Sequence, residues 1–154
     1  MRVADIMTRD VVVVAPDTMV SEIARLMWHH KLSGLPIVDA SGQVVGIVSE
    51  MDLLARNANL HVPTYLRVLD VMIPLGNRHE FEEELRRAVG TTAREVMSPD
   101  VVTVAPDTDL ADAATLMMDK RFKRLPVVER GKLVGIISAG DFLRLLAQDI
   151  PTES

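Results

Sequence analysis

Cysteine is absent from this chain of 154 residues. Its absence excludes a disulfide framework, thiolate metal ligands and a cysteine nucleophile. Aromatic residues are scarce as well, at 3%, so we expect a core built from valine, leucine, isoleucine and the 9 methionines. The longest apolar runs fall far short of the ~20 residues that a membrane helix needs, and Asp5 and Asp10 make the N-terminal stretch unlike a secretory signal. We therefore expect a soluble, cytoplasmic protein.

Positive charge is also in the minority. The formal net charge is -5, which argues against a general electrostatic grip on nucleic acid but leaves room for a local basic pocket that holds a small anion. Hydrophobic residues make up 48% and charged residues 25% of the chain, a balance that predicts a buried core. The length allows one ordinary domain or two very small ones. Neither nucleic acid nor a membrane is expected as a partner.

The chain contains one internal repeat. The segment Asp10–Thr18 reappears, with one change, as Asp100–Thr108, and Leu35-Pro36 reappears as Leu125-Pro126. Further along, Gly46–Asp52 matches the segment that starts at Gly135 and ends at Asp141. Chance does not produce this many matches in register, so the chain carries two copies of one unit.

Each copy is predicted to run strand, helix, strand, strand, helix. In the first copy the β-branched run Val11–Val14 predicts a strand that ends before Pro16, and Asp17 and Thr18 are typical N-cap residues. The apolar side chains that follow recur at helical spacing, as they do in the second copy: Val20, Ile23, Ala24 and Met27, then Leu110, Ala113, Ala114 and Met117. Strands at 35–38 and 44–48, a turn at 39–42 and a helix from Ser49 to about Asn57 complete the unit.

The fold class is therefore mixed α/β (α+β), with two β-α-β-β-α repeats. Each copy has roughly 55 residues, too few to bury a stable core alone, so we expect the two to pack around a pseudo-twofold axis. The boundaries are 1–58 for the first repeat, 59–90 for an insert and 91–150 for the second repeat. The insert has an apolar stretch after Pro63 and then Phe81, Leu85 and Val89 at helical spacing, which predicts a helical insert. It packs onto the repeats, serves a second subunit or partner, or covers a ligand site as a lid.

A Ser-x-x-Asp motif closes the last strand of each copy, as Ser49 with Asp52 and Ser138 with Asp141. One interpretation is a capping box, in which both side chains satisfy free N–H groups at the helix start. The other is a nucleoside site, because a helix N-terminus favours phosphate and a carboxylate accepts hydrogen bonds from a ribose diol. Gly46 and Gly135, which lack a Cβ, would then let a flat ring approach the backbone.

Taken together, these motifs resemble a tandem pair of cystathionine β-synthase (CBS) domains, also called a Bateman module. The resemblance rests on the strand-plus-proline segments 12–16 and 102–106, the second-strand segments 33–38 and 123–128, and the two Gly-hydrophobic-x-Ser-x-x-Asp motifs. It covers nearly the whole chain except the insert. It implies clefts between the repeats that bind AMP, ADP, ATP, S-adenosylmethionine or, in some members, a dinucleotide. It also implies a homodimer, with Trp28 as a candidate for the subunit interface.

The resemblance also assigns residues to two sites. Ser49 with Asp52 and Ser138 with Asp141 would hold ribose and phosphate. Each site borrows from the other repeat, so the Asp141 site would place Ile136, Val12 and Ser33 near the base. The Asp52 site would place there Ile47, Val102 and Lys123.

Basic residues distinguish the two copies, because Lys123 and Arg124 stand where the first copy has Ser33 and Gly34. One interpretation is a solvated basic loop from Lys120 to Arg124. The other, which we favour, is that Lys123 and Arg124 contact phosphate, since a guanidinium binds phosphate through two donors.

The sequence favours a binding module over an enzyme. It shows no nucleophile–base pair, no metal cluster and no Gly-x-x-x-x-Gly-Lys phosphate loop; the adjacent His29 and His30 diverge by about 100° on a helix and do not share one ion. We therefore expect no catalytic residue, no metal and no catalytic cofactor. The predicted function is a regulatory sensor of an adenosine nucleotide, with an effector protein as a further partner. The alternative is a dimerisation or interaction scaffold with unoccupied clefts.

Overall fold

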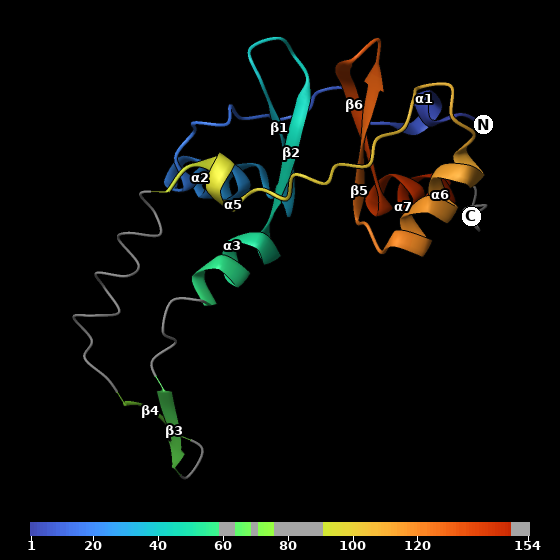
Figure 1. Cartoon of the computed structure of the whole chain (residues 1–154). Helices are drawn as coiled ribbons and strands as arrows, with labels where there is room; N and C mark the ends of the chain where they lie inside the picture. Colours follow the sequence, from blue (N-terminus) through green and yellow to red (C-terminus); the bar gives the residue numbers. More distant parts are fainter. Residues whose placement is uncertain (59–63, 69–70, 76–90, 149–154) are drawn as a thin grey trace.

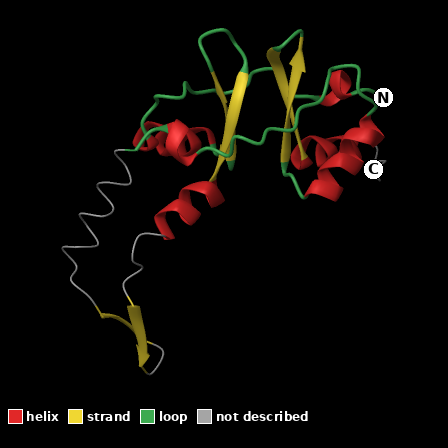
Figure 2. Cartoon of the chain, viewed as in Figure 1, coloured by secondary structure: helices red, strands yellow, loops and turns green. Residues whose placement is uncertain are grey.

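The structure, a computed structural model, describes residues 1–58, 64–68, 71–75 and 91–148. Two antiparallel β-hairpins lie next to each other at the centre, and helices lie on the outer side of each (Figure 1). The colouring by secondary structure makes this pairing of hairpin and helices clear in both halves (Figure 2). The predicted mixed α/β class with two similar units is confirmed.

Each unit contains a helix, a hairpin and a second helix. The first unit consists of α2 (Val20–His30), β1 (Gly34–Val38), β2 (Val44–Ser49) and α3 (Glu50–Ala58). The second unit consists of α6 (Leu110–Lys120), β5 (Arg124–Glu129), β6 (Lys132–Ser138) and α7 (Ala139–Gln148). In both hairpins the proline of the second-strand motif pairs with the isoleucine that follows the glycine, as Pro36 with Ile47 and Pro126 with Ile136. The repeat in the sequence is therefore a repeat in register.

The predicted strand at Val11–Val14 is wrong, because only Val14 pairs, through one isolated parallel bridge to Ile37. Val14 N donates to Pro36 O at 3.3 Å, and Val38 N donates to Val14 O at 2.9 Å. Continuing the ladder toward Val12 would need an N–H on Pro36, and continuing it the other way would need one on Pro16. Proline has none, so the ladder stops after one bridge. Val104 and Val127 repeat this arrangement.

The predicted N-caps are also wrong, because α2 begins one residue later, after Met19, which makes no side-chain cap. Thr18 Oγ1 instead accepts a hydrogen bond from Ala15 N at 3.1 Å and stabilises the preceding turn. In the second unit the cap is Asp109, whose carboxylate accepts from Ala111 N at 2.9 Å. The two long helices therefore start at equivalent positions with different caps.

The insert differs from the predicted helical segment wherever the structure describes it. Thr64–Val68 (β3) and Val71–Leu75 (β4) form an antiparallel hairpin, which stands away from the two units in Figure 1. Its apolar run is short and rich in β-branched residues. In so short a run, periodicity alone cannot tell a strand from a helix. Pro74 also disfavours a helix interior. The predicted helix around Phe81, Leu85 and Val89 lies outside the described residues.

The two units exchange their leading segments. The short helix α1 (Val3–Ile6) packs into the core of the second unit, and α5 (Ala93–Val96) packs into the core of the first. Val3 N donates to Thr108 O at 2.9 Å, and Ala93 N donates to Thr18 O at 2.8 Å. Each core therefore contains part of the other copy, which gives the expected interdependence of the two repeats a structural basis.

Both cores are aliphatic, as the scarcity of aromatic residues predicts. Among the described residues, the buried hydrophobic side chains are those of valine, leucine, isoleucine, methionine and alanine. Leu35 and Leu125 hold equivalent central positions, with exposed fractions of 1% and 0%.

Candidate ligand cleft

The junction between β2 and α3 carries the first Ser-x-x-Asp motif. Asp52 Oδ2 accepts hydrogen bonds from Ser49 N at 2.9 Å and from Ser49 Oγ at 3.0 Å. In return, Asp52 N donates to Ser49 Oγ at 3.2 Å. This reciprocal pattern is a capping box, so the structural interpretation of the motif is confirmed. The box also fixes the carboxylate at the helix N-terminus, where a ligand can reach it.

Ser98 brings a third hydroxyl to this carboxylate. Its Oγ donates to Asp52 Oδ1 at 3.1 Å. Two backbone hydrogen bonds hold it against β2: Ile47 N donates to Ser98 O at 3.1 Å, and Ser98 N donates to Ile47 O at 2.9 Å. The sequence analysis does not single out Ser98. The available signal is the repeat itself, because Thr8 and Ser98 follow the matched Met7 and Met97.

A cavity of about 290 Å³ opens beside Asp52. It brings together all the residues predicted for the Asp52 site, and Ser33, which the resemblance assigns to the other site, also lies on its wall. Glu50, Ser98 and Phe122 line it as well. The predicted residues on this wall are Ser33, Ile47, Ser49, Asp52, Val102, Lys123 and Arg124.

Arg124 links the second unit to the cleft of the first. Its guanidinium donates a hydrogen bond to Ser33 Oγ and fills the space where a side chain on Gly34 would stand. Burial lowers the pKa of Arg124, while the Glu50 and Asp52 carboxylates act to raise it. A guanidinium stays protonated in proteins near neutral pH, so Arg124 is cationic. The cleft is therefore lined by the carboxylates of Glu50, Asp52 and Asp100 together with the Arg124 guanidinium.

The carboxylate of the second motif accepts the corresponding hydrogen bonds and one more. Asp141 Oδ2 accepts from Ser138 N at 2.8 Å and from Ser138 Oγ at 3.1 Å, and Thr8 Oγ1 donates to Asp141 Oδ1 at 3.1 Å. Arg144 Nη2 also donates to Asp141 Oδ1, at 3.0 Å, and to the carbonyl oxygen of Ile6 at 2.9 Å. Asp141 is only 4% exposed.

The residues predicted around Asp141 are partly dispersed. Ile136 lies next to this end, because its backbone N and O both bond to Thr8 at 2.9 Å. Val12 packs against the core of the first unit, and Ser33 lies on the wall of the Asp52 cavity. The structure thus assembles the predicted Asp52 set more completely than the Asp141 set.

The two glycines that were expected to leave room for a ligand ring are covered by methionine side chains. A Cβ on Gly46 would lie 2.5 Å from Met97 Sδ, and a Cβ on Gly135 would lie 2.8 Å from Met7 Sδ. The missing Cβ serves internal packing at both positions. The prediction that these glycines provide a platform for a base is therefore wrong.

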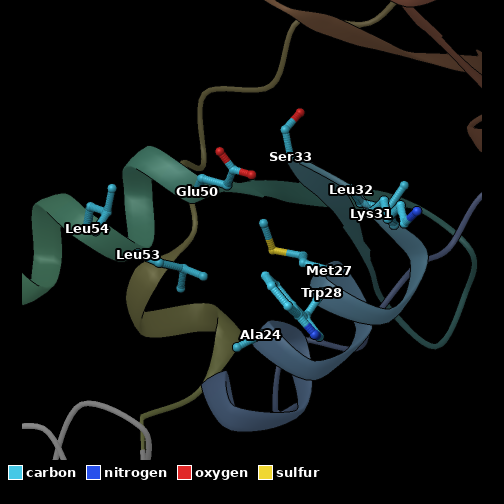
Figure 3. Close-up of a pocket in the computed structure, with 9 residues that line it drawn as sticks. All are labelled: Ala24, Met27, Trp28, Lys31, Leu32, Ser33, Glu50, Leu53 and Leu54. Carbon is cyan, nitrogen blue, oxygen red and sulfur yellow. The ribbon is translucent and has the colours of Figure 1, made fainter.

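A larger, mainly apolar cavity of about 880 Å³ lies between α2 and α3. Figure 3 shows Trp28, Met27 and Leu53 facing this space, with Glu50 and Ser33 at its upper edge. Trp28 is 85% exposed and Leu54 is 61% exposed. Ser33 and Glu50 line both cavities, so the polar cleft and the apolar surface share a wall.

No group of three or more His, Cys, Asp or Glu side chains in the part of the chain that the structure describes is arranged to hold a metal ion. His29 and His30, the adjacent pair, have their rings edge to face with centroids 5.1 Å apart. No helix in the described ranges is long and apolar enough to span a membrane.

Comparisons with known proteins give a consistent result. A family model described as CBS domain matches residues 3–59 and 93–148. An uncharacterized protein of Methanocaldococcus jannaschii, MJ1426, is 34% identical over 95% of this chain and 91% of its own length. The chloroplastic CBS domain-containing protein CBSX2 of Arabidopsis thaliana is also 34% identical, over 95% of this chain, which spans 63% of that protein.

Two solved structures show the same architecture. A crystal structure of CBSX2 in complex with AMP has a TM-score of 0.72 and 32% identity, and the match covers 96% of each chain. A putative acetoin utilization protein from Vibrio cholerae has a TM-score of 0.74 and 30% identity, over 96% of this chain and 91% of its own.

Proposed function

The chain belongs to the CBS domain family, and from this premise we propose that it is a regulatory module that binds an adenosine nucleotide in the cleft at Asp52. The observation that carries the proposal is that carboxylates and cations meet in one cavity. Asp52, Lys123 and Arg124 all line it, as do Glu50, Asp100 and Arg121. A nucleotide has the matching polarity, since its ribose donates hydrogen bonds and its phosphate accepts them.

Each part of the ligand has a chemical counterpart in the cleft. Asp52 accepts from the ribose hydroxyls, and Ser49 and Ser98 surround them with further polar groups. Arg124 holds the phosphate through parallel N–H donors, with Lys123 as a second cation. Ile47 and Val102 supply apolar surface for the base. AMP is the first candidate, because a relative with 32% identity was crystallised with AMP; ADP, ATP and S-adenosylmethionine follow.

The chain is also similar to part of an enzyme. Inosine-5'-monophosphate dehydrogenase of Methanocaldococcus jannaschii is 28% identical over 91% of this chain, which spans only 22% of that enzyme. The similarity is thus limited to a small part of that enzyme. We propose that the present chain catalyses no reaction, and that it acts in the cytoplasm through an effector protein.

Binding is tested by thermal unfolding with AMP, adenosine and S-adenosylmethionine. A ligand at 100 times its Kd adds about 2.7 kcal/mol to the free energy of unfolding, which raises Tm by roughly 5 to 11 °C for a chain of this size. Arg124→Ala should weaken AMP binding roughly tenfold to a hundredfold, because a charge-assisted hydrogen bond is lost, and leave adenosine binding unchanged.

The matched control is Arg25→Ala, which removes an exposed arginine from α2, where it pairs only with Glu22. It should change neither affinity. No shift with any adenosine compound would contradict nucleotide binding and favour the scaffold. An equal loss for AMP and adenosine in Arg124→Ala would exclude the phosphate role of Arg124.

We further propose that the chain forms a homodimer, as the exposed apolar residues favour. Trp28 and Met118 occupy equivalent positions in α2 and α6, and both are largely exposed, at 85% and 78%. Leu54 and Leu143 are likewise equivalent in α3 and α7, at 61% and 66%. Two related apolar faces on one chain suit a second copy related by a twofold axis.

Sedimentation velocity tests the dimer. The wild-type chain should sediment as a dimer at micromolar concentration, and Trp28→Glu should sediment as a monomer because a charge replaces the largest apolar contact. Lys132→Glu, a charge change at the exposed start of β6 far from these helices, should remain dimeric. A wild-type monomer at all concentrations would contradict the proposal.

A further inference from the structure

The carboxylate of Asp141 has no free acceptor position. An ionised carboxylate offers about four lone-pair positions. At Asp141 these face Ser138 N, Ser138 Oγ, Thr8 Oγ1 and Arg144 Nη2, at 2.8, 3.1, 3.1 and 3.0 Å. With 4% of its surface exposed, this side chain is also shielded from solvent. A ribose hydroxyl would have to displace a partner that is already in place.

The carboxylate of Asp52 differs by one hydrogen bond. Ser49 N and Ser49 Oγ fill Oδ2, as in the second unit, but Oδ1 accepts only from Ser98 Oγ among the described residues. The position equivalent to Arg144 is Ala55, which has no donor in its side chain. Asp52 is half-buried and lines a cavity, so its carboxylate, with one donor fewer among the described residues, borders a space that a ligand can enter.

Arg144 has a second attachment that makes its position structural. The same Nη2 that contacts Asp141 donates to the carbonyl oxygen of Ile6 at 2.9 Å. Ile6 ends α1, the helix that the N-terminal segment contributes to the core of the second unit. Arg144 therefore joins α7, the Asp141 carboxylate and α1 in one cluster. The Arg144 side chain is 56% exposed and Asp141 only 4%, so loss of this contact would leave a buried carboxylate with one donor fewer.

We propose that the two motifs have divided roles, so that each chain binds one adenosine nucleotide, at Asp52, while Asp141 and Arg144 form a structural ion pair that closes the second cleft and holds α1. The inference rests on the proposed function, since it says which cleft is used. It replaces the expectation from the resemblance that Ser138 and Asp141 anchor a ligand. Whether the aspartate binds a ligand or forms an ion pair depends on the residue three positions after it, which is Ala55 after Asp52 and Arg144 after Asp141.

Isothermal titration of the full chain with AMP, and separately with S-adenosylmethionine, tests this division. The wild-type stoichiometry should be one per chain. Asp52→Asn should weaken binding roughly tenfold to a hundredfold, because one hydrogen bond to a charged acceptor is weakened, and should shift Tm little without ligand. Asp141→Asn should leave the affinity within about threefold and lower Tm without ligand by more than Asp52→Asn does.

A second variant keeps the test valid if Asp141→Asn does not fold. Arg144→Leu removes the cation but keeps an apolar stem, and it should add a second, weaker site per chain by freeing Asp141. Two equal sites in the wild type, or equal losses of affinity from Asp52→Asn and Asp141→Asn, would overturn the division of roles and leave nucleotide binding intact. No heat with either ligand would overturn the proposed function and the single site with it, while the ligand-free Tm values still decide whether Asp141 is structural.

Discussion

The Asp52 end of the first unit and the Asp141 end of the second start from the same motif, yet different cations approach them. At Asp52 the nearby guanidinium is Arg124, which arrives from the other unit and bonds to Ser33 on the cavity wall. At Asp141 it is Arg144, which arrives from the same helix and bonds directly to the carboxylate. In the first case the guanidinium bonds to a neutral hydroxyl, and in the second it forms an ion pair with the motif carboxylate.

This difference shows how a duplicated unit can diverge without changing its fold. Both copies share the hairpin register, the hydrogen bonds from the motif serine to the aspartate, and a hydroxyl from the other copy's leading segment, Thr8 or Ser98, that donates to the same carboxylate. The copies differ in Arg124, which stands in place of Gly34, and in Arg144, which stands in place of Ala55. In the proposed division of roles, these two side chains leave one end open to a nucleotide and close the other, while the apolar pattern preserves the architecture.

The largest expected effect is on stability, and it shows whether the two units unfold together. Leu35→Ala and Leu125→Ala each remove a fully buried side chain from one core, so each should cost about 2–5 kcal/mol and lower Tm by roughly 4 to 20 °C. Because α1 and α5 are exchanged, either change should lower a single transition. Calorimetry checks this, and two separate transitions of which only one moves would show that the units unfold independently.

A smaller effect on the free energy of unfolding is expected at Gly46 and Gly135, which contact methionine side chains, than at the leucines. Gly135→Ala places a Cβ 2.8 Å from Met7 Sδ and 3.0 Å from the Thr8 carbonyl oxygen, and such overpacking costs about 1–3 kcal/mol. Gly46→Ala meets Met97 in the same way and should fall in the same range. Urea unfolding measures both.

Gly140→Ala is the matched control for these two changes. Gly140 lies in α7, and the nearest atom to its added Cβ is Ser138 Oγ at 3.5 Å. Alanine in a helix is better than glycine by about 0.5–1 kcal/mol, so this variant should be more stable than the wild type. Destabilisation by Gly140→Ala equal to that by Gly135→Ala would mean that the methionine contacts are not the cause.

Much of the local structure could be predicted from the sequence. The periodic apolar positions correctly place α2 and α6, and the Asp39–Gly42 segment forms the predicted turn, with Ser41 N donating to Asp39 Oδ1 at 2.9 Å and Gly42 at a φ of 87°. The same hydrogen bonds, led by the one from the Ser41 hydroxyl, lower the pKa of Asp39. These features depend on neighbours within a few residues, which a sequence pattern contains.

The predictions for the Val11–Val14 strand and for the insert failed for reasons that are themselves physical. The valine run before Pro16 has strand propensity, but two prolines remove the donors that a longer parallel ladder needs. The apolar run in the insert lacks a distinguishing period, and the described part of it forms the β3–β4 hairpin. In both places propensity alone was a weaker constraint than the supply of backbone hydrogen bonds.

By itself the sequence determined that the chain is a duplicated unit, that its core is aliphatic, and that a Ser-x-x-Asp motif ends the hairpin in each copy. Only the tertiary structure decided which leading helix completes which core and which cation meets which carboxylate. Arg144 touches the carbonyl oxygen of a residue 138 positions away, and Arg124 touches a hydroxyl 91 positions away. Such contacts exist only because the two units pack together and bring distant residues within reach. The strength of a charge interaction then depends on distance and burial, which sequence spacing does not give.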